Sequence, residues 1–361
     1  MADPNLPRLR CHECGNTFSP DAFDADAARV RCPDCGAAVS NRVDEDGYDR
    51  PRRRRAARGG SSMKWVIGIG AVLGILGLGC CGVIVGLVWY TIKPTDFGEQ
   101  TQEYTEARKA FKTSLTHKGR APQIFEPVKP PPEVTEITYL SGDLELRAWI
   151  DKPQVALRTK PAVLFLHGGY AFAIDDWDQC KPFRNAGFVT MTPMLRGENG
   201  LPGSFSLFYD EVDDVLAAAE VLAKTPGIDP KRVYVAGHSA GGTLAMLAAM
   251  TSKRFRACAS FSGSPDQVAF LRQQPLDVAP FDSNNRKELM MRSPLAFPRS
   301  FQCPARLYFG DEEFMFEFSI RALAEKAQAA GKDVQSVEVP GDHMTSVDSA
   351  IGQAILFFEQ K

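Results

Sequence analysis

The feature that most constrains this 361-residue sequence is a short glycine-rich stretch between a β-like run and a helical pattern. The apolar run Val233–Ala236 leads into Gly-His-Ser-Ala-Gly, and a helical pattern follows from Thr243 to Met250. A G-x-S-x-G motif requires this strand–turn–helix context, because the sharp turn exposes the serine hydroxyl at the start of the helix. The pattern predicts Ser239 as a nucleophile, with the backbone N–H of Ala240 placed to stabilise an oxyanion. The alternative is an ordinary glycine-rich turn between a strand and a helix.

A second glycine-rich loop follows an earlier apolar run. Residues Ala162–Leu166 are typical of a buried strand, and His-Gly-Gly-Tyr follows at positions 167–170. Glycines in such a loop allow backbone N–H groups to approach a reacting carbonyl. We expect Gly169 or Tyr170 to supply the second N–H group of an oxyanion hole, and His167 to be structural.

A serine nucleophile needs a base at neutral pH, and histidine is the usual one. Of the five histidines, His343 follows the strand-like run 337–340 near the C-terminus, in the chain order serine, acid, histidine. The other four are His12 in the N-terminal part, His117 in the segment 93–132, His167 in the glycine-rich loop, and His238 beside the nucleophile, with a side chain expected to point elsewhere. We therefore predict His343 as the base.

The acid that orients this histidine is expected after the preceding strand, Ala305–Phe309. Three carboxylates follow that strand, at positions 311 to 313; Asp311 and Glu313 are the candidates, and the residue type favours Asp311. Asp342, directly before His343, is a third and weaker candidate.

Residues 160–359 resemble α/β-hydrolases of the prolyl oligopeptidase-like and dienelactone hydrolase-like branch. The matching pieces are His167–Gly169, Pro193–Gly197, Ile228–Arg232, Gly237–Gly242, Arg292–Pro294 and Pro340–His343. The resemblance implies an eight-stranded, mostly parallel sheet flanked by helices, with Leu144–Ile150 as an early antiparallel strand. It also favours Glu313 as the acid, because in such relatives the acid stands three positions after the glycine that ends the strand.

The resemblance implies acyl transfer from an ester or peptide substrate to water, with no cofactor for the chemistry. Large prolyl oligopeptidases carry a propeller domain over the site, and residues 93–132 are too few to form one. We therefore expect a site that is open or covered by a local cap from residues 266–300, which favours a carboxylesterase. The alternatives are a serine peptidase, another acyl hydrolase such as a lipase or deacetylase, and a catalytically silent scaffold.

The N-terminal part, residues 8–40, carries two C-x-x-C pairs separated by 17 residues. They consist of Cys11, Cys14, Cys32 and Cys35. Two such pairs can close a tetrahedral thiolate site, and so short a segment would draw its folding free energy from the metal. It resembles the small zinc-ribbon modules of many bacterial membrane proteins, which implies a structural zinc ion. The alternative is a pair of redox dithiols or disulfides.

Residues 65–92 contain no charged side chain and are long enough to cross a bilayer as a helix. Aromatic residues stand at both ends, as in interfacial belts. The preceding linker, residues 41–64, is rich in arginine, which predicts a cytoplasmic N-terminus. The sequence thus predicts a single-pass membrane protein whose hydrolase domain, residues 133–361, lies on the extracytoplasmic side.

Two further expectations concern partners. Gly70 with Gly74, and Gly82 with Gly86, have the G-x-x-x-G spacing that permits close helix pairing, so a homodimer through the span is one option. The net charge of −2 gives no reason to expect a nucleic-acid partner.

Residues 93–132, with five prolines in their last eleven residues, are expected to form a stalk.

Overall fold

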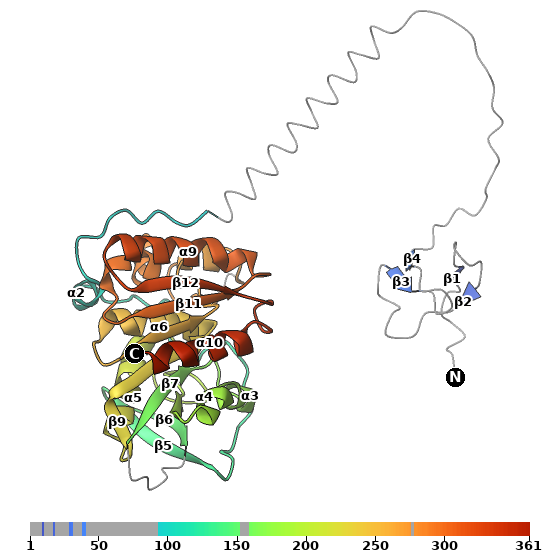
Figure 1. Cartoon of the computed structure of the whole chain (residues 1–361). Coiled ribbons are helices and arrows are strands. Elements are labelled where there is room, and N and C mark those ends of the chain that lie inside the picture. The colour runs from blue at the N-terminus through green and yellow to red at the C-terminus, as the bar shows by residue number, and fades with distance from the viewer. Residues whose placement is uncertain are drawn as a thin grey trace, which may run out of the picture. The chain divides into compact units, whose positions relative to one another are not determined.

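The structure, a computed structural model, describes residues 93–151, 159–275 and 278–361, together with four short strands near the N-terminus (Figure 1). The chain divides into two units, Met1–Leu73 and Gly74–Lys361. The predicted basic linker, residues 41–64, and the predicted span, residues 65–92, lie outside the described residues. Within the described part of the chain, every helix is too short or too polar to cross a membrane.

The N-terminal unit contains two pairs of short antiparallel strands. Strand β1 (Leu9–Arg10) pairs with β2 (Thr17–Phe18), and β3 (Arg29–Arg31) pairs with β4 (Ala38–Ser40). In the sequence, one C-x-x-C motif stands between the two strands of each pair. The four cysteines themselves lie outside the described residues, so the zinc site stays a prediction.

The second unit is built on one eight-stranded sheet with the order β12-β11-β10-β9-β7-β8-β6-β5. Its strands are β5 (Val134–Ser141), β6 (Leu144–Asp151), β7 (Lys160–Leu166), β8 (Val189–Pro193), β9 (Ile228–His238), β10 (Cys258–Phe261), β11 (Ala305–Gly310) and β12 (Val334–Val339). The pairs β5–β6 and β6–β8 are antiparallel, and the other neighbours are parallel. The predicted α/β fold with a mostly parallel sheet is confirmed, and the predicted early antiparallel strand is β6.

Helices cover both faces of this sheet (Figure 1). One face carries α3 (Ile174–Gln179), α4 (Lys181–Asn185) and α10 (Val347–Glu359), and the other carries α5 (Glu211–Lys224), α6 (Ala240–Thr251) and α9 (Phe314–Ala329). Strand β7 is apolar from Ala162 to Leu166 because both of its faces are covered: Val163 and Phe165 pack on the first face, while Leu164 and Leu166 pack on the second.

Residues 266–300, expected to form a cap, fold into four short elements. These are α7 (Gln267–Leu271), α8 (Arg286–Met291) and the 3₁₀ turns η1 (Pro294–Ala296) and η2 (Pro298–Ser300). Of this region, only Phe270 and Gln274 are among the described residues that line the cavity at the candidate site. The region therefore forms part of one wall of that cavity.

The segment expected to be a free stalk instead packs against the hydrolase domain. It contains α2 (Tyr104–Ala110), and the Tyr104 side chain is completely buried. The Tyr104 hydroxyl donates to the Met291 carbonyl at 2.9 Å, and its backbone N–H donates to Ser300 Oγ at 2.9 Å. The segment is polar in overall composition, but a few of its aromatic side chains, such as Tyr104, are buried and bind it to the domain.

A buried ion pair fixes the next part of the same segment. Arg292 Nη1 lies 2.5 Å from Glu288 Oε2, and both side chains are almost fully buried. Thr113 Oγ1 donates to the same carboxylate at 2.8 Å and accepts from Arg292 Nη2 at 2.7 Å, while Arg292 Nε donates to the Ser206 carbonyl. Buried charges are tolerated when they are paired and hydrogen-bonded in this way. Residues 93–118 are thus integral to the domain.

We expect Tyr104→Ala to lower the free energy of unfolding by about 3 kcal/mol, because a buried aromatic side chain and its hydrogen bond are lost. Chemical denaturation of the full chain, followed by the fluorescence of the buried Trp149 and Trp177, measures this change. Ile124→Ala is the matched control, since Ile124 is 93% exposed and its truncation should change stability by less than about 0.5 kcal/mol. Equal stabilities for the two variants would mean that the segment is a free stalk after all.

Candidate active site

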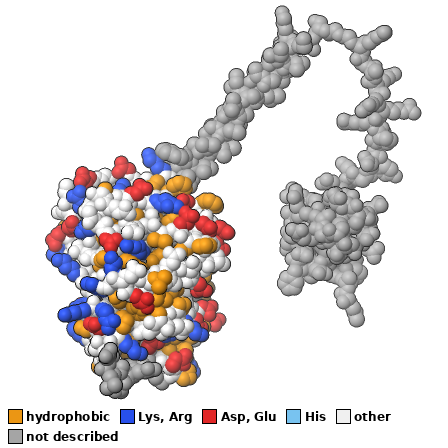
Figure 2. Space-filling model, viewed as in Figure 1, with side chains coloured by type: hydrophobic (Ala, Val, Ile, Leu, Met, Phe, Trp, Pro, Cys, Tyr) orange, Lys and Arg blue, Asp and Glu red, His pale blue; other side chains and the backbone are white. Residues whose placement is uncertain are grey.

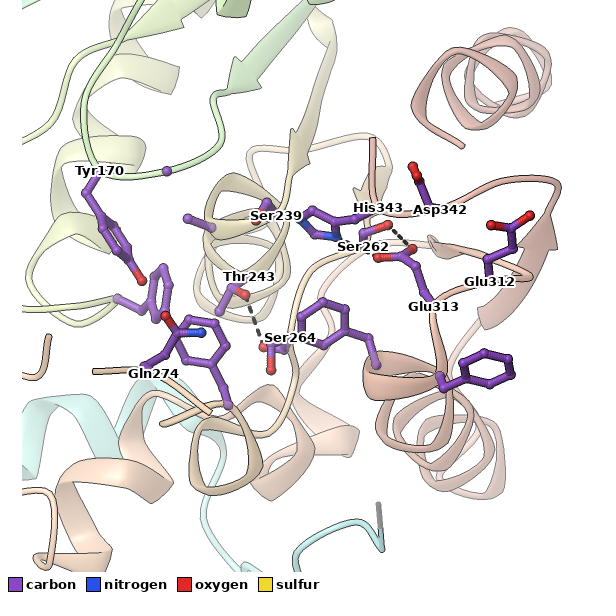
Figure 3. A pocket seen from close by; sticks show the side chains of 16 residues that line it. Tyr170, Ser239, Thr243, Ser262, Ser264, Gln274, Glu312, Glu313, Asp342 and His343 are labelled. Carbon is purple, nitrogen blue, oxygen red and sulfur yellow. Dashed lines mark hydrogen bonds and ion pairs between the residues drawn. The ribbon is translucent and has the colours of Figure 1, made fainter. Parts of the chain in front are cut away.

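Ser239 occupies a strained turn between strand β9 and helix α6. Its φ of 54° and ψ of −115° are unusual for a residue with a side chain. A Cβ atom at Gly237 would lie 2.3 Å from the Gly241 carbonyl oxygen, and one at Gly241 would lie 2.0 Å from the Leu166 carbonyl oxygen. Both positions therefore require glycine. The predicted elbow geometry is present and points the Ser239 hydroxyl into a cavity (Figure 3).

His343 lies within hydrogen-bond reach of this hydroxyl. Its Nε2 is 3.0 Å from Ser239 Oγ, although the two residues are 104 positions apart in the chain. The loop after strand β12 brings them together at the carboxyl edge of the sheet (Figure 3). A neutral imidazole with its proton on Nδ1 presents Nε2 as the acceptor for the serine proton, which is the geometry of a general base.

Glu313 is the carboxylate on the other side of this imidazole. Its Oε1 lies 2.6 Å from His343 Nδ1, and its Oε2 accepts the Gly310 N–H at 2.7 Å and the Ser262 hydroxyl. Burial raises the pKa of Glu313, but the hydrogen bonds from His343, Gly310 and Ser262 outweigh it and hold the pKa below its usual value. The group is therefore a buried carboxylate that fixes the tautomer and orientation of the imidazole.

The two alternative acids shape the loop that carries His343. Asp311 Oδ1 accepts the Gly341 N–H at 2.8 Å. Asp342 Oδ1 accepts the backbone N–H groups of Met344 and Thr345 at 2.9 and 2.8 Å. Within the described part of the chain, neither carboxylate forms a hydrogen bond with the imidazole ring. The structure thus places Glu313, rather than Asp311 or Asp342, beside the candidate base.

The predicted oxyanion loop lies against the nucleophile, but one of its N–H groups is already engaged. The Tyr170 N–H donates to the side-chain oxygen of Gln123 at 2.7 Å. The Gly169 N–H forms no hydrogen bond to any described residue, and Gly169 lines the cavity. Ala240 is the first residue of α6, where a helix leaves its N–H groups unpaired. Gly169 and Ala240, which both line the cavity, are therefore the candidate donors for an oxyanion.

His167 supports this loop from the protein interior, as its predicted structural role requires. Its Nε2 lies 3.1 Å from Glu198 Oε2, and its Nδ1 lies 2.8 Å from the Gly168 carbonyl oxygen. Burial lowers the pKa of His167, but the Glu198 carboxylate outweighs it and raises the pKa to about 9. The imidazole is therefore a buried cation at neutral pH.

His238 has a role that the sequence did not reveal. Its Nε2 lies 2.9 Å from the backbone carbonyl oxygen of His343, and the two rings are 4.9 Å apart. Burial, and after it the electrostatic effect of the neighbouring His343 ring, lowers the pKa of His238 to about 4, so the His238 ring is neutral and donates its Nε2 proton to that carbonyl. It therefore supports the backbone of the candidate base. No pattern in the sequence distinguishes this contact from an ordinary x position of the G-x-S-x-G motif.

A cavity of about 540 Å³ opens over Ser239. Five aromatic residues line it: Tyr170, Phe208, Phe270, Phe314 and Phe316. Its polar lining consists mainly of hydroxyls and an amide on one side, and of the carboxylates of Glu312, Glu313 and Asp342 on the other (Figure 3). The described lining contains no lysine or arginine.

We expect Glu313→Gln to lower kcat by about 10⁴-fold, because an amide fails to hold the imidazole in the required tautomer. Asp311→Asn should lower kcat by less than about 10-fold, because it perturbs only the hydrogen bond to the Gly341 N–H. Steady-state kinetics of the two variants side by side distinguish the acids. A larger loss in Asp311→Asn would reverse the assignment.

The His167–Glu198 pair predicts a loss of stability at high pH. A histidine whose pKa is raised in the folded state stabilises the fold fully below its unfolded pKa of about 6.5 and loses that contribution as the pH rises through about 9. The unfolding free energy of wild type relative to His167→Gln should therefore decrease between pH 7 and pH 9.5. Denaturation of both proteins across this range measures the difference, and a difference that does not change with pH would show that His167 is not a cation at pH 7.

Comparison with known proteins agrees with this geometry. Residues 176–331, which include Ser239 and Glu313, match the model of the prolyl oligopeptidase family. Two curated relatives from Bacillus subtilis (strain 168) align with 49% of the chain, and both are named uncharacterized peptidases. YtmA is 24% identical over 190 residues and 72% of its length is covered, whereas YuxL is 25% identical over 199 residues and 30% of its length is covered.

Solved structures show the same fold at low sequence identity. An acylaminoacyl peptidase in complex with Z-Gly-Gly-Phe-chloromethyl ketone has a TM-score of 0.53 at 22% identity, over 63% of this chain and 41% of that one. A puromycin-hydrolyzing peptidase of Mycobacterium tuberculosis has a TM-score of 0.55 at 20% identity, over 63% and 40%. A Pyrobaculum calidifontis esterase has a TM-score of 0.50 at 19% identity, over 64% and 86%.

These peptidase structures are more than twice as long as the part that aligns with them, so they establish the architecture of one domain. The sheet order, the elbow and the family match agree on what that domain is. Residues 176–331 therefore match the prolyl oligopeptidase family, within a domain that has the α/β-hydrolase fold.

Proposed function

We propose that this chain is a serine peptidase in which Ser239 is the nucleophile, His343 the base and Glu313 the acid. The observation that supports this best is the continuous hydrogen-bonded chain from Ser239 Oγ through both nitrogens of His343 to Glu313 Oε1, with distances of 3.0 and 2.6 Å. Ser239, at one end of this hydrogen-bonded series, lines a cavity large enough to hold a peptide side chain beside its hydroxyl.

The reaction follows from this arrangement. Ser239 Oγ attacks the carbonyl carbon of the scissile bond while its proton moves to His343 Nε2. The carbonyl oxygen becomes an anion that the N–H groups of Gly169 and Ala240 stabilise. The tetrahedral intermediate then releases the amine, which takes the proton from His343, and leaves an acyl group on Ser239. A water molecule then attacks this ester while its proton moves to His343. The carboxylic acid product leaves, and His343 returns the proton to Ser239.

The sequence favoured a carboxylesterase because residues 93–132 are too few to form a propeller over the site. The comparisons support peptidase chemistry more strongly. The family match and both curated relatives point to peptidases, and one of these relatives is covered over 72% of its own length. The peptidase name is therefore not confined to much longer chains, which weakens the argument from the missing propeller.

The aromatic and acidic lining of the cavity limits which residues of a peptide substrate it would favour. Aromatic side chains form much of the wall, and the charged lining residues are all acidic. An apolar residue beside the scissile bond gains from the aromatic wall, and a cationic one gains from Glu312 and Asp342. An acidic residue would be repelled and would find no cation among the described lining residues. We therefore propose peptides with apolar or basic residues at the scissile bond as substrates.

The test uses the full chain as wild type, Ser239→Ala and the control Ser252→Ala, whose hydroxyl lies at the far end of helix α6. Labelling by a fluorophosphonate measures the activated serine. Coumarin amides of short peptides ending in Phe, Arg or Asp, together with short-chain p-nitrophenyl esters, measure turnover. We expect labelling and turnover to be lost in Ser239→Ala only, with Phe or Arg peptides cleaved at least about 10-fold faster than Asp peptides.

The outcomes separate the candidates. Hydrolysis of the esters but of none of the peptides would favour the carboxylesterase function instead. Preferred cleavage of Asp peptides would overturn the proposed substrate class and leave the mechanism intact. A folded wild type that neither labels nor cleaves would make the chain a silent member of the fold, acting through what it binds.

A further inference from the structure

A short segment upstream of the sheet lies against the loops around the candidate site. We call residues 119–125 the strap. The Phe205 N–H donates to the Gly119 carbonyl at 2.9 Å, and the Ala121 N–H donates to the Gly197 carbonyl at 3.0 Å. These two bonds attach the strap to the loop that follows strand β8. The strap lies outside the region that matches the family.

Gln123 extends from the strap to the oxyanion loop. Its Oε1 accepts the Tyr170 N–H at 2.7 Å. The same oxygen lies 2.5 Å from the position that a Cβ atom at Gly169 would occupy. Gln123 is not among the described residues that line the catalytic cavity, so it contacts the loop from outside that cavity.

The contact matters because Gly169 has little conformational restraint of its own. Its φ is +62°, in the left-handed region that glycine visits freely. The hydrogen bond from Tyr170 fixes the peptide plane that follows Gly169, while the His167–Glu198 pair fixes the residue two positions before it. The Gly168 carbonyl, which shares a peptide plane with the Gly169 N–H, lies 2.8 Å from His167 Nδ1, so the peptide planes on both sides of Gly169 are held at the cavity that Ser239 also lines. Misplacing a catalytic donor by about 1 Å can reduce a rate by as much as ~10²-fold.

We infer that Gln123 is a positioning residue, which holds the oxyanion loop so that the Gly169 N–H faces the carbonyl attacked by Ser239. This inference rests on the proposed function, because it assigns Gln123 a part in stabilising the same oxyanion. The competing arrangement is a plug, in which Tyr170 is the true donor and Gln123 blocks it.

Two substitutions of similar length separate these arrangements in the full chain. Gln123→Glu keeps a side-chain oxygen as the acceptor, and Gln123→Met removes it. We expect kcat for the best peptide substrate to fall about 10-fold in Gln123→Met, with KM changed less than about 2-fold, and to stay within about 3-fold of wild type in Gln123→Glu. This loss is smaller than the ~10²-fold cost of deleting an oxyanion donor outright. Glu126→Gln, an exposed change three positions further along the chain, is the matched control.

Two further readouts distinguish positioning from a general loss of structure. A peptide aldehyde that forms a tetrahedral adduct with Ser239 should bind about 10-fold more weakly to Gln123→Met, in parallel with kcat. Amide hydrogen exchange at Tyr170 should be slow in wild type and Gln123→Glu and fast in Gln123→Met. The melting temperature and the fraction of protein labelled by fluorophosphonate should match wild type in all variants.

The results that overturn the inference differ from those that overturn the proposed function. A wild type without labelling or turnover removes the proposed function and the role of Gln123 together. An active wild type with an unchanged kcat in Gln123→Met removes only the role of Gln123. A faster Gln123→Met variant would identify the plug, with Tyr170 as the donor.

Discussion

The whole site depends on a close approach of three backbone segments at the carboxyl edge of the sheet. The turn after strand β9 is so tight that a Cβ atom at Gly237 would meet the Gly241 backbone, and it lies so near the end of strand β7 that a Cβ atom at Gly241 would meet the Leu166 carbonyl. This contact sets Ser239 in its strained conformation and places helix α6 with its first N–H groups beside the hydroxyl. It also brings the glycine loop after β7 within reach of the serine. A side chain at either glycine would push the turn away from the end of strand β7 and separate Ser239 from the candidate oxyanion donor on the loop after β7.

Around that contact the site is held by supports that do not themselves react. Glu198 holds His167 below the oxyanion loop, and Gln123 contacts the loop from outside the cavity. On the other side, His238 donates to the backbone of His343. The groups proposed to do the chemistry therefore sit on turns and loops, and hydrogen bonds from neighbouring segments hold these loops. Because separate residues support these loops, the hydrogen-bond distances between Ser239, His343 and Glu313 can be maintained on segments outside the helices and strands.

The sequence was informative where chemistry requires a particular residue at a particular backbone position. The elbow around Ser239, the mostly parallel sheet and the position of His343 could be predicted, because glycine spacing, apolar runs and chain order are local signals. The choice between Asp311 and Glu313 rested on a resemblance, since both carboxylates follow the same strand. Gln123 and His238 could not be found, because their roles arise from contacts with residues distant in the sequence. The stalk was predicted from polar composition, which gives too little weight to single buried anchors such as Tyr104.

The packing of residues 93–118 has a mechanical consequence. A flexible stalk would absorb a pull on the N-terminal part of the chain by extending. Here the segment is bound to the domain from Thr95 onward, first through the Thr95 N–H on Asp266 and then through Tyr104 and Thr113. A force applied from the N-terminal side is therefore transmitted to α8 and its buried Glu288–Arg292 pair, whose neighbouring loop carries Phe208 of the cavity wall. A pull from that side would therefore load contacts that border the cavity wall, which a flexible stalk would leave undisturbed.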